Sequence, residues 1–183
     1  MFFVKEMERN NLKDKILAAR EAAAVKRFHT FPHIKEQTVG QHSFNMLCML
    51  FQLFEEPSLN LIKAVIYHDF GERWVGDVPA TARWLNEDFK KSIDSLEEQV
   101  RKNYGFYVEL NEEELSILKS LDALELFYWA MDESSLGNKN AAEILEKVTP
   151  VLKDFGFITH EFFRDKTFFS GDFRTPDEEG FKK

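Results

Sequence analysis

Apolar residues recur at three- to four-residue spacing along most of the chain, and the strict alternation typical of strands is almost absent. In the segment 11–27, for example, Leu12, Ile16 and Leu17 share one helical face with the run Ala23 to Val25. The pattern predicts an all-α fold in which one layered helical domain spans residues 1–183.

Helix start and stop signals divide this pattern into elements. Ser58 is a suitable N-cap, Gly71 and Gly105 are suitable C-caps, and Asn111 with Glu114 resembles a capping box. Pro32 and Gly40 indicate a loop over 28–41. The predicted helices are 11–27, 42–54, 59–71, a short one opening near Pro79, 86–104, Asn111 to about Met131, and about 140–154.

Composition narrows the classes of protein. The 183 residues carry a net charge of −8, which argues against general affinity for a nucleic-acid polymer but not against a small phosphorylated ligand. A single cysteine, Cys48, excludes a disulfide within the chain, and its apolar surroundings predict a small core residue. No apolar run is long enough to span a bilayer and no signal peptide is evident, so we expect a cytoplasmic protein without a membrane partner.

Candidate chemistry is concentrated in the stretch IYHDFGERWVGDVP. His68, Asp69, Glu72 and Asp77 follow an apolar run within ten positions. If the helix 59–71 continues, His68 and Glu72 are neighbours one turn apart. Imidazole and carboxylate groups are good ligands for divalent transition metals, but two ligands make a weak site. Alone, the stretch is equally consistent with a polar helix end.

Two further residues offer the missing ligands. His42 begins the preceding apolar helix, and Asp122 lies in the middle of LKSLDALELFYWA among several leucines. A carboxylate in such surroundings needs a partner or a metal if it is buried. The alternative for Asp122 is a solvated helix face. His29 and His33 flank Pro32, which argues against a helical ligand pair, and we expect no catalytic part for His160.

The order His42, His68-Asp69, Asp122 resembles the H…HD…D signature of HD-domain metal-dependent phosphohydrolases. The stretches RFHTFPHIKEQTVGQHS, HDFGERWVGDVP and LKSLDALELFYWAMDESSLGN are similar to motifs of the bacterial 5′-deoxynucleotidase group, whose second motif reads HDxxExxxGDxP. The similarity covers about residues 20–155. It implies a single HD-domain helical bundle, with the N-terminal helix and the Phe-rich tail added to that core.

The resemblance also implies roles for individual residues. His42, His68, Asp69 and Asp122 would hold one divalent transition metal: Co, Mn, Zn, Fe or Ni. Glu72 would position or activate the attacking water, and Asp77 would act as a second acid/base or water-orienting carboxylate. Basic residues near the substrate phosphate would be Arg27, Lys35, Arg83 and Lys119.

The implied reaction is hydrolysis of a deoxynucleoside monophosphate to deoxynucleoside and phosphate. One alternative is a triphosphohydrolase that acts on dNTP, as related viral enzymes act on dATP, and for such a polyphosphate substrate Mg is a candidate additional metal. A third possibility is a non-catalytic HD module that binds nucleotide. Relatives of this kind are homo-oligomers, so a dimer or larger assembly is expected.

The chain departs from this group at one position. Where the group has tryptophan after the arginine, this chain has Phe28. That tryptophan packs near the sugar and helps to exclude ribonucleotides, so Phe28 is a candidate substrate-binding residue that affects selectivity. The tail from Phe155 contains eight of the 19 phenylalanines and is expected to pack on outer helices or to form a subunit interface.

Overall fold

The structure is a computed structural model that describes residues 2–154, with only the backbone described for residues 2–10, 84 and 154. The all-α prediction is confirmed, because the described residues form helices and no strand. These are α1 Phe2–Ala23, α2 Val39–Leu53, α3 Leu59–Tyr67, α4 Glu72–Val75, α5 Ala80–Leu85, α6 Glu87–Tyr104, α7 Glu112–Ser135 and α8 Ala141–Asp154. The predicted tail contacts and His160 lie outside the described residues.

Several predicted helix ends are confirmed by the caps that form them. Ser58 and Asn86 accept hydrogen bonds from the first turns of α3 and α6. Asn111 and Glu114 form the predicted capping box of α7, and Gly105 ends α6 in the left-handed conformation with φ of 74°. The end of α7 was predicted too early, since the helix continues past Met131 to Ser135.

Two predicted boundaries near the candidate site are wrong. Helix α2 begins at Val39, three residues before His42, because Thr38 and Gln41 form a capping box. Helix α3 ends at Tyr67, so the predicted helix 59–71 stops before the candidate ligands. A turn over residues 68–71 then leads into α4. His68 and Glu72 are therefore not neighbours on one continuous helix.

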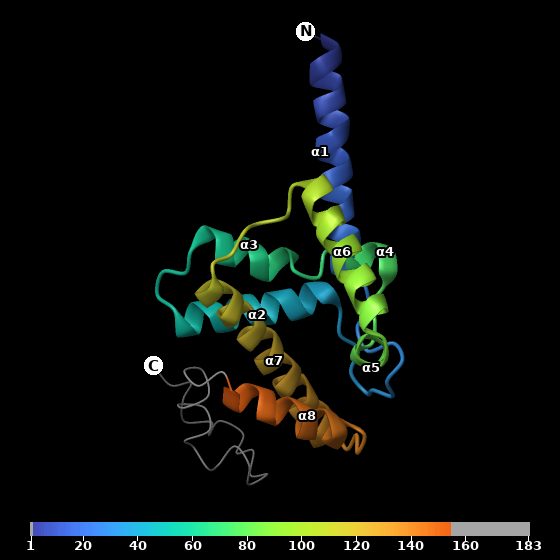
Figure 1. Cartoon of the computed structure of the whole chain (residues 1–183), viewed down its shortest axis with the longest axis vertical. Helices are drawn as coiled ribbons and strands as arrows, with labels where there is room; N and C mark the ends of the chain where they lie inside the picture. Colours follow the sequence, from blue (N-terminus) through green and yellow to red (C-terminus); the bar gives the residue numbers. More distant parts are fainter. Residues whose placement is uncertain (1, 155–183) are drawn as a thin grey trace, which may run out of the picture.

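The core lies where α2, α3 and α7 meet, and α8 packs against α7 (Figure 1). Met46 and Leu50 of α2 pack with Val65 of α3 and Leu121 of α7, all of them fully buried. Full burial of four such side chains stabilises the fold by about 1.5–3 kcal/mol each. The same three elements carry the candidate site at one end of this core.

The prediction that Cys48 is a core residue is wrong. Cys48 is exposed, because the buried face of α2 carries Met46 and Leu50 and residue 48 lies between them on the outer side. On α1 the face that carries Leu12, Ile16 and Leu17 is exposed, and the packed face carries Ala18 and Ala22 instead. Small alanines allow α1 to approach Phe70 closely.

No helix within residues 2–154 has the length and apolar content that crossing a membrane requires. Cytoplasmic location stays a prediction.

Candidate metal centre

Each element places its candidate ligand through a local structure. The capping box at Thr38 fixes the first turn of α2, and His42 lies in that turn with no exposed surface. His68 and Asp69 occupy the corner between α3 and α4. Helix α6 holds this corner, because the Arg101 guanidinium donates to the His68 carbonyl. Gly71 also lies so close to α6 that a Cβ atom there would be 2.8 Å from Glu97 Cα.

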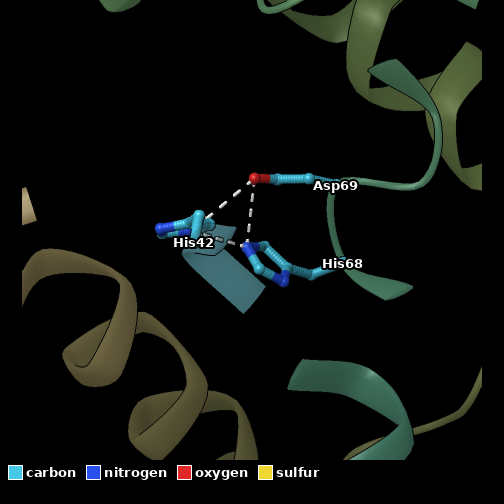
Figure 2. Close-up of side chains that lie close together, drawn as sticks. All are labelled: His42, His68 and Asp69. Atoms are coloured by element: carbon cyan, nitrogen blue, oxygen red, sulfur yellow. Dashed lines mark hydrogen bonds and ion pairs between the residues drawn. The ribbon is translucent and has the colours of Figure 1, made fainter. Parts of the chain in front are cut away.

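The ligating atoms of three side chains gather at one point (Figure 2). His42 Nε2 is 3.2 Å from His68 Nε2 and 3.7 Å from Asp69 Oδ2, and His68 Nε2 is 3.2 Å from Asp69 Oδ2. Asp122 joins from α7, with Oδ1 at 3.2 Å from His42 Nε2. The structure thus brings together all four residues of the H…HD…D pattern, although Asp122 reaches the group through His42 and its side chain is 49% exposed.

The hydrogen-bond partners of the two imidazoles test whether a cation fits. His42 Nδ1 is 2.7 Å from a Glu125 carboxylate oxygen, and His68 Nδ1 is 2.9 Å from the Val65 carbonyl oxygen. Both partners only accept hydrogen bonds, so Nδ1 carries the hydrogen in each ring. In the neutral rings both Nε2 lone pairs then point into the space that also faces the two aspartates. Two imidazole nitrogens and two carboxylates form a donor set that can hold a divalent transition metal.

The charges in the cluster are strongly coupled. Burial alone would lower the pKa of His68, but the adjacent Asp69 outweighs it and raises that pKa to about 9. Burial would raise the pKa of Asp69, whereas His68 and His42 hold it well below its usual range. The pKa of Asp122 is lowered for the same reason, chiefly by His42. The cluster therefore keeps both aspartates ionised, as metal ligands must be, whereas His68 has to lose a proton when a cation binds.

Glu72 lies beside the cluster without joining it. Its side chain is buried, and Oε2 has no hydrogen-bond partner among the described residues. Burial, together with the charges of Asp69 and Asp77, raises the pKa of Glu72 to about 10. A buried carboxyl group with an unused oxygen is unusual outside functional sites, because the group is costly to bury.

Asp77 makes a specific contact of a different kind. Its Oδ2 accepts a hydrogen bond of 2.6 Å from the backbone N–H of Phe28, whose φ is +58°. Phe28 stacks on Trp129 with ring centroids 3.7 Å apart. A left-handed phenylalanine is strained, so the carboxylate and the stacked ring together maintain this conformation.

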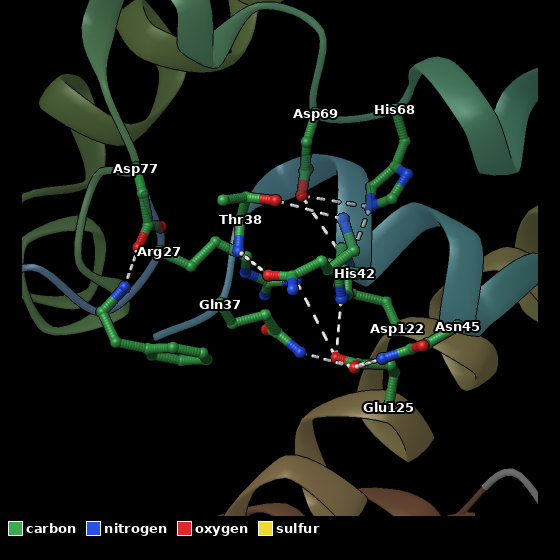
Figure 3. Close-up of polar contacts among 12 residues, drawn as sticks. Arg27, Gln37, Thr38, His42, Asn45, His68, Asp69, Asp77, Asp122 and Glu125 are labelled. Carbon is green, nitrogen blue, oxygen red and sulfur yellow. Dashed lines mark hydrogen bonds and ion pairs between the residues drawn. The ribbon is translucent and has the colours of Figure 1, made fainter. Parts of the chain in front are cut away.

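Of the four basic candidates, Arg27 is the one that the structure places against the cluster (Figure 3). Its side chain is 10% exposed, and Nη1 lies 4.0 Å from Glu125 Oε2. Burial would lower its pKa, but Asp69, Asp122, Glu125 and Glu72 raise it. Its Nε and Nη1 atoms are buried and lack hydrogen-bond partners among the described residues. Unused guanidinium donors of this kind suit an oxyanion.

The remaining basic candidates lie apart from the cluster or have acidic partners. The Lys35 ammonium pairs with Asp132, which lies ten residues after Asp122 on α7 and thus about 15 Å along the axis. Arg83 pairs with Asp94 and Glu97 of α6 at 2.8 and 2.7 Å. Lys119 is exposed on α7, one turn before Asp122. His29 and His33 lie in the loop, as predicted.

Sequence reasoning missed the polar residues behind His42. Glu125 is 2% exposed and contacts His42, while Gln37 and Asn45 donate to its other oxygen at 2.7 and 2.9 Å. A signal was present, since Glu125 lies three residues after Asp122 within the same apolar segment. Two acids at this spacing project from neighbouring positions on a helix.

Comparison with known proteins gives consistent results. Residues 17–170 match a family described as 5′-deoxynucleotidase YfbR-like. A 5′-deoxynucleotidase from Pectobacterium atrosepticum is 24% identical over 138 residues, which cover 62% of this chain and 69% of that protein.

Two solved structures are similar in fold. The first is an HD-domain phosphohydrolase from Listeria innocua, with a TM-score of 0.67, 17% identity and coverage of 79% of this chain and 81% of the other. The second is a protein from Pyrococcus horikoshii, with a TM-score of 0.57, 21% identity and coverage of 78% and 97%.

Proposed function

Because the chain belongs to the YfbR-like 5′-deoxynucleotidase family, we propose that it is a metal-dependent phosphohydrolase of deoxynucleoside monophosphates. The reaction consumes water and releases the deoxynucleoside and inorganic phosphate. The observation that carries this proposal is the convergence of His42, His68, Asp69 and Asp122 from three separate elements, with both imidazole Nδ1 atoms facing acceptors.

In the proposed site these four residues hold one divalent transition metal. Nitrogen and oxygen donors in equal number are compatible with Co, Mn, Zn, Fe or Ni, and imidazole ligands make Mg a poorer occupant. When bound, such an ion polarises a phosphoryl oxygen and supplies positive charge where negative charge develops.

The neighbouring residues handle the water and the phosphate. Glu72, whose buried Oε2 has no partner among the described residues, is suited to orient the attacking water and, once ionised, to accept its proton. The unused Nε and Nη1 donors of Arg27 are suited to the phosphate oxygens. Asp77 supports the same end of the site by holding the backbone of Phe28 next to Arg27.

A monophosphate is favoured over a triphosphate by the distribution of charge. Additional phosphates need additional cations to neutralise them. Lys35 and Arg83, two of the four basic residues first considered for that role, have carboxylate partners at 3.5 Å or closer. Of the four, Arg27 is the buried one beside the cluster. The names of the family and of the relatives given above do not include a triphosphohydrolase, and that activity is one outcome of the test.

The test is a substrate screen on purified, metal-loaded protein. All four dNMPs, all four dNTPs and the matching ribonucleotides are incubated with the protein, and orthophosphate is measured separately from triphosphate. We expect orthophosphate from dNMPs, abolition by a chelator, and recovery on addition of Co²⁺ or Mn²⁺. An Asp122→Ala variant that hydrolyses dNMPs as fast as wild type would contradict the proposed site. Assembly into a homo-oligomer stays a prediction.

A further inference from the structure

Glu125 occupies a central position behind the cluster. It lies on α7 three residues after Asp122, and its side chain is 2% exposed. Both carboxylate oxygens have partners. Oε1 accepts from Gln37 Nε2 at 2.7 Å and Asn45 Nδ2 at 2.9 Å, and Oε2 lies 2.7 Å from His42 Nδ1 and 4.0 Å from Arg27 Nη1.

These contacts compensate for removing the charge from water. Oε1 accepts from two amide NH₂ groups, and Oε2 lies beside His42 and the Arg27 guanidinium, so these surroundings suit an ionised carboxylate. An ionised carboxylate offers only acceptor sites. Whatever donates to Glu125 must therefore keep its hydrogen on the side that faces this residue.

For His42 this requirement selects one tautomer. With the hydrogen fixed on Nδ1, the lone pair of Nε2 faces Asp122, Asp69 and His68. A carboxylate on the distal nitrogen also increases the basicity of the imidazole and fixes the orientation of its ring. His42 has no exposed surface, so in the intact site Glu125 and not bulk water faces Nδ1.

From this geometry we propose that Glu125 is a positioning residue that holds His42 as an Nε2 donor and thereby sets the affinity for the metal. The inference rests on the metal-dependent function proposed above. It adds a residue that contacts neither the metal nor the substrate. Glu125 also contacts Arg27, the residue expected to bind the substrate phosphate. The metal ligands and the phosphate-binding residue therefore both depend on this carboxylate.

The test compares Co²⁺ binding by wild type and a Glu125→Gln variant. The amide keeps the size of the side chain but cannot accept at both ends. Whichever way it turns, its NH₂ group faces either His42 or the two amide donors. Loss of such a supporting carboxylate typically weakens metal affinity about 10- to 100-fold. Titration followed by the visible absorption of bound Co²⁺ measures the affinity and the ligand geometry without any turnover.

Glu133→Gln is a matched control. Glu133 is also on α7 and fully buried, but its carboxylate accepts from the backbone N–H groups of Ile34 and Lys35 and from Asn138. It touches none of the four proposed ligands. A change at Glu133 should lower the free energy of unfolding while the Co²⁺ affinity of the folded protein stays at the wild-type value.

The outcomes separate the two proposals. If wild type binds Co²⁺ and folded Glu125→Gln binds it equally well, the positioning role is refuted while the metal site stands. If wild type binds no Co²⁺, the proposed function fails and this inference fails with it.

A second measurement does not depend on whether the variant folds. Nitrogen-15 NMR of Zn²⁺-loaded wild type should detect a hydrogen on His42 Nδ1, and a bare Nδ1 would overturn the assignment.

Discussion

The buried carboxyl group of Glu72 predicts a measurable dependence of stability on pH. Its pKa rises from the ordinary 4.5 to about 10 in the fold. Between these values the folded protein keeps a proton that the unfolded chain has released. Unfolding therefore releases a proton, and the free energy of unfolding falls as the pH rises through this window. The effect is absent below pH 4.5 and complete above pH 10.

The size of the effect at neutral pH is set by the pKa of Glu72 in the unfolded chain. Because the pKa in the fold lies above 7, the loss of stability at pH 7 is set by the interval from 4.5 to 7. At about 1.4 kcal/mol per pH unit, this interval corresponds to about 3 kcal/mol. Glu72→Gln keeps the shape of the side chain and removes the titration. The variant should thus gain stability over wild type by about 1.4 kcal/mol for each unit between pH 6 and 9.

Urea denaturation in the presence of a chelator at pH 6, 7, 8 and 9 measures this difference. Groups common to both proteins cancel, and the exposed Glu56→Gln variant should follow wild type at every pH. Added Co²⁺ should reduce the slope, since a nearby cation favours the ionised carboxylate. Parallel wild-type and Glu72→Gln curves across the range would refute the reasoning.

Four further predictions concern single residues. Glu72→Gln should also lose about 10²- to 10⁴-fold in hydrolysis while retaining the metal, and retained activity would mean that another group accepts the proton. Asp77→Asn should keep most activity because its carbonyl oxygen can still accept from the Phe28 N–H, whereas Asp77→Ala should raise KM. A loss of about 100-fold in kcat for the Asn variant would instead indicate that Asp77 transfers a proton. Phe28→Trp should leave metal content unchanged and raise the ratio of deoxyribonucleotide to ribonucleotide hydrolysis, and an unchanged ratio for matched pairs removes Phe28 from selectivity. Gly71→Ala should lower the free energy of unfolding by about 1–3 kcal/mol, measured in urea, because the added Cβ meets the Glu97 backbone at 2.8 Å.

Much of the helical framework could be predicted because its signals are local. The capping-box residues Asn111 and Glu114 are only three residues apart. Gly105 directly follows the last residue of α6 and adopts the left-handed conformation that favours glycine. The start of α2 was missed although Thr38 and Gln41 form the same kind of box. Gly40 inside that segment had favoured a loop. Local signals therefore predict helix ends well, but competing signals need tertiary information to resolve.

Within the candidate site, the order of residues along the chain indicates which ligands could meet, but it does not indicate which residues hydrogen-bond to those ligands. The expectation that His42, His68, Asp69 and Asp122 meet rests on their order along the chain, which can be read directly from the sequence. Glu125 depends on burial at one face of α7, where the apolar pattern is too continuous to define a direction. The pairing of Arg83 with α6 and of Lys35 with Asp132 likewise depends on how distant segments pack. No pattern within either segment encodes those contacts.

The corner at His68 and Asp69 has a consequence for how the protein matures. Three proposed ligands are already present once residue 69 has been synthesised, but Asp122 and the supporting Glu125 belong to α7, which starts at Glu112. On the proposed ligand set, a nascent chain acquires full metal affinity only after α7 has docked on α2 and α3. A metal bound at that stage stabilises the finished fold over partly assembled ones. Free metal present during translation would then favour the completed fold over these earlier states.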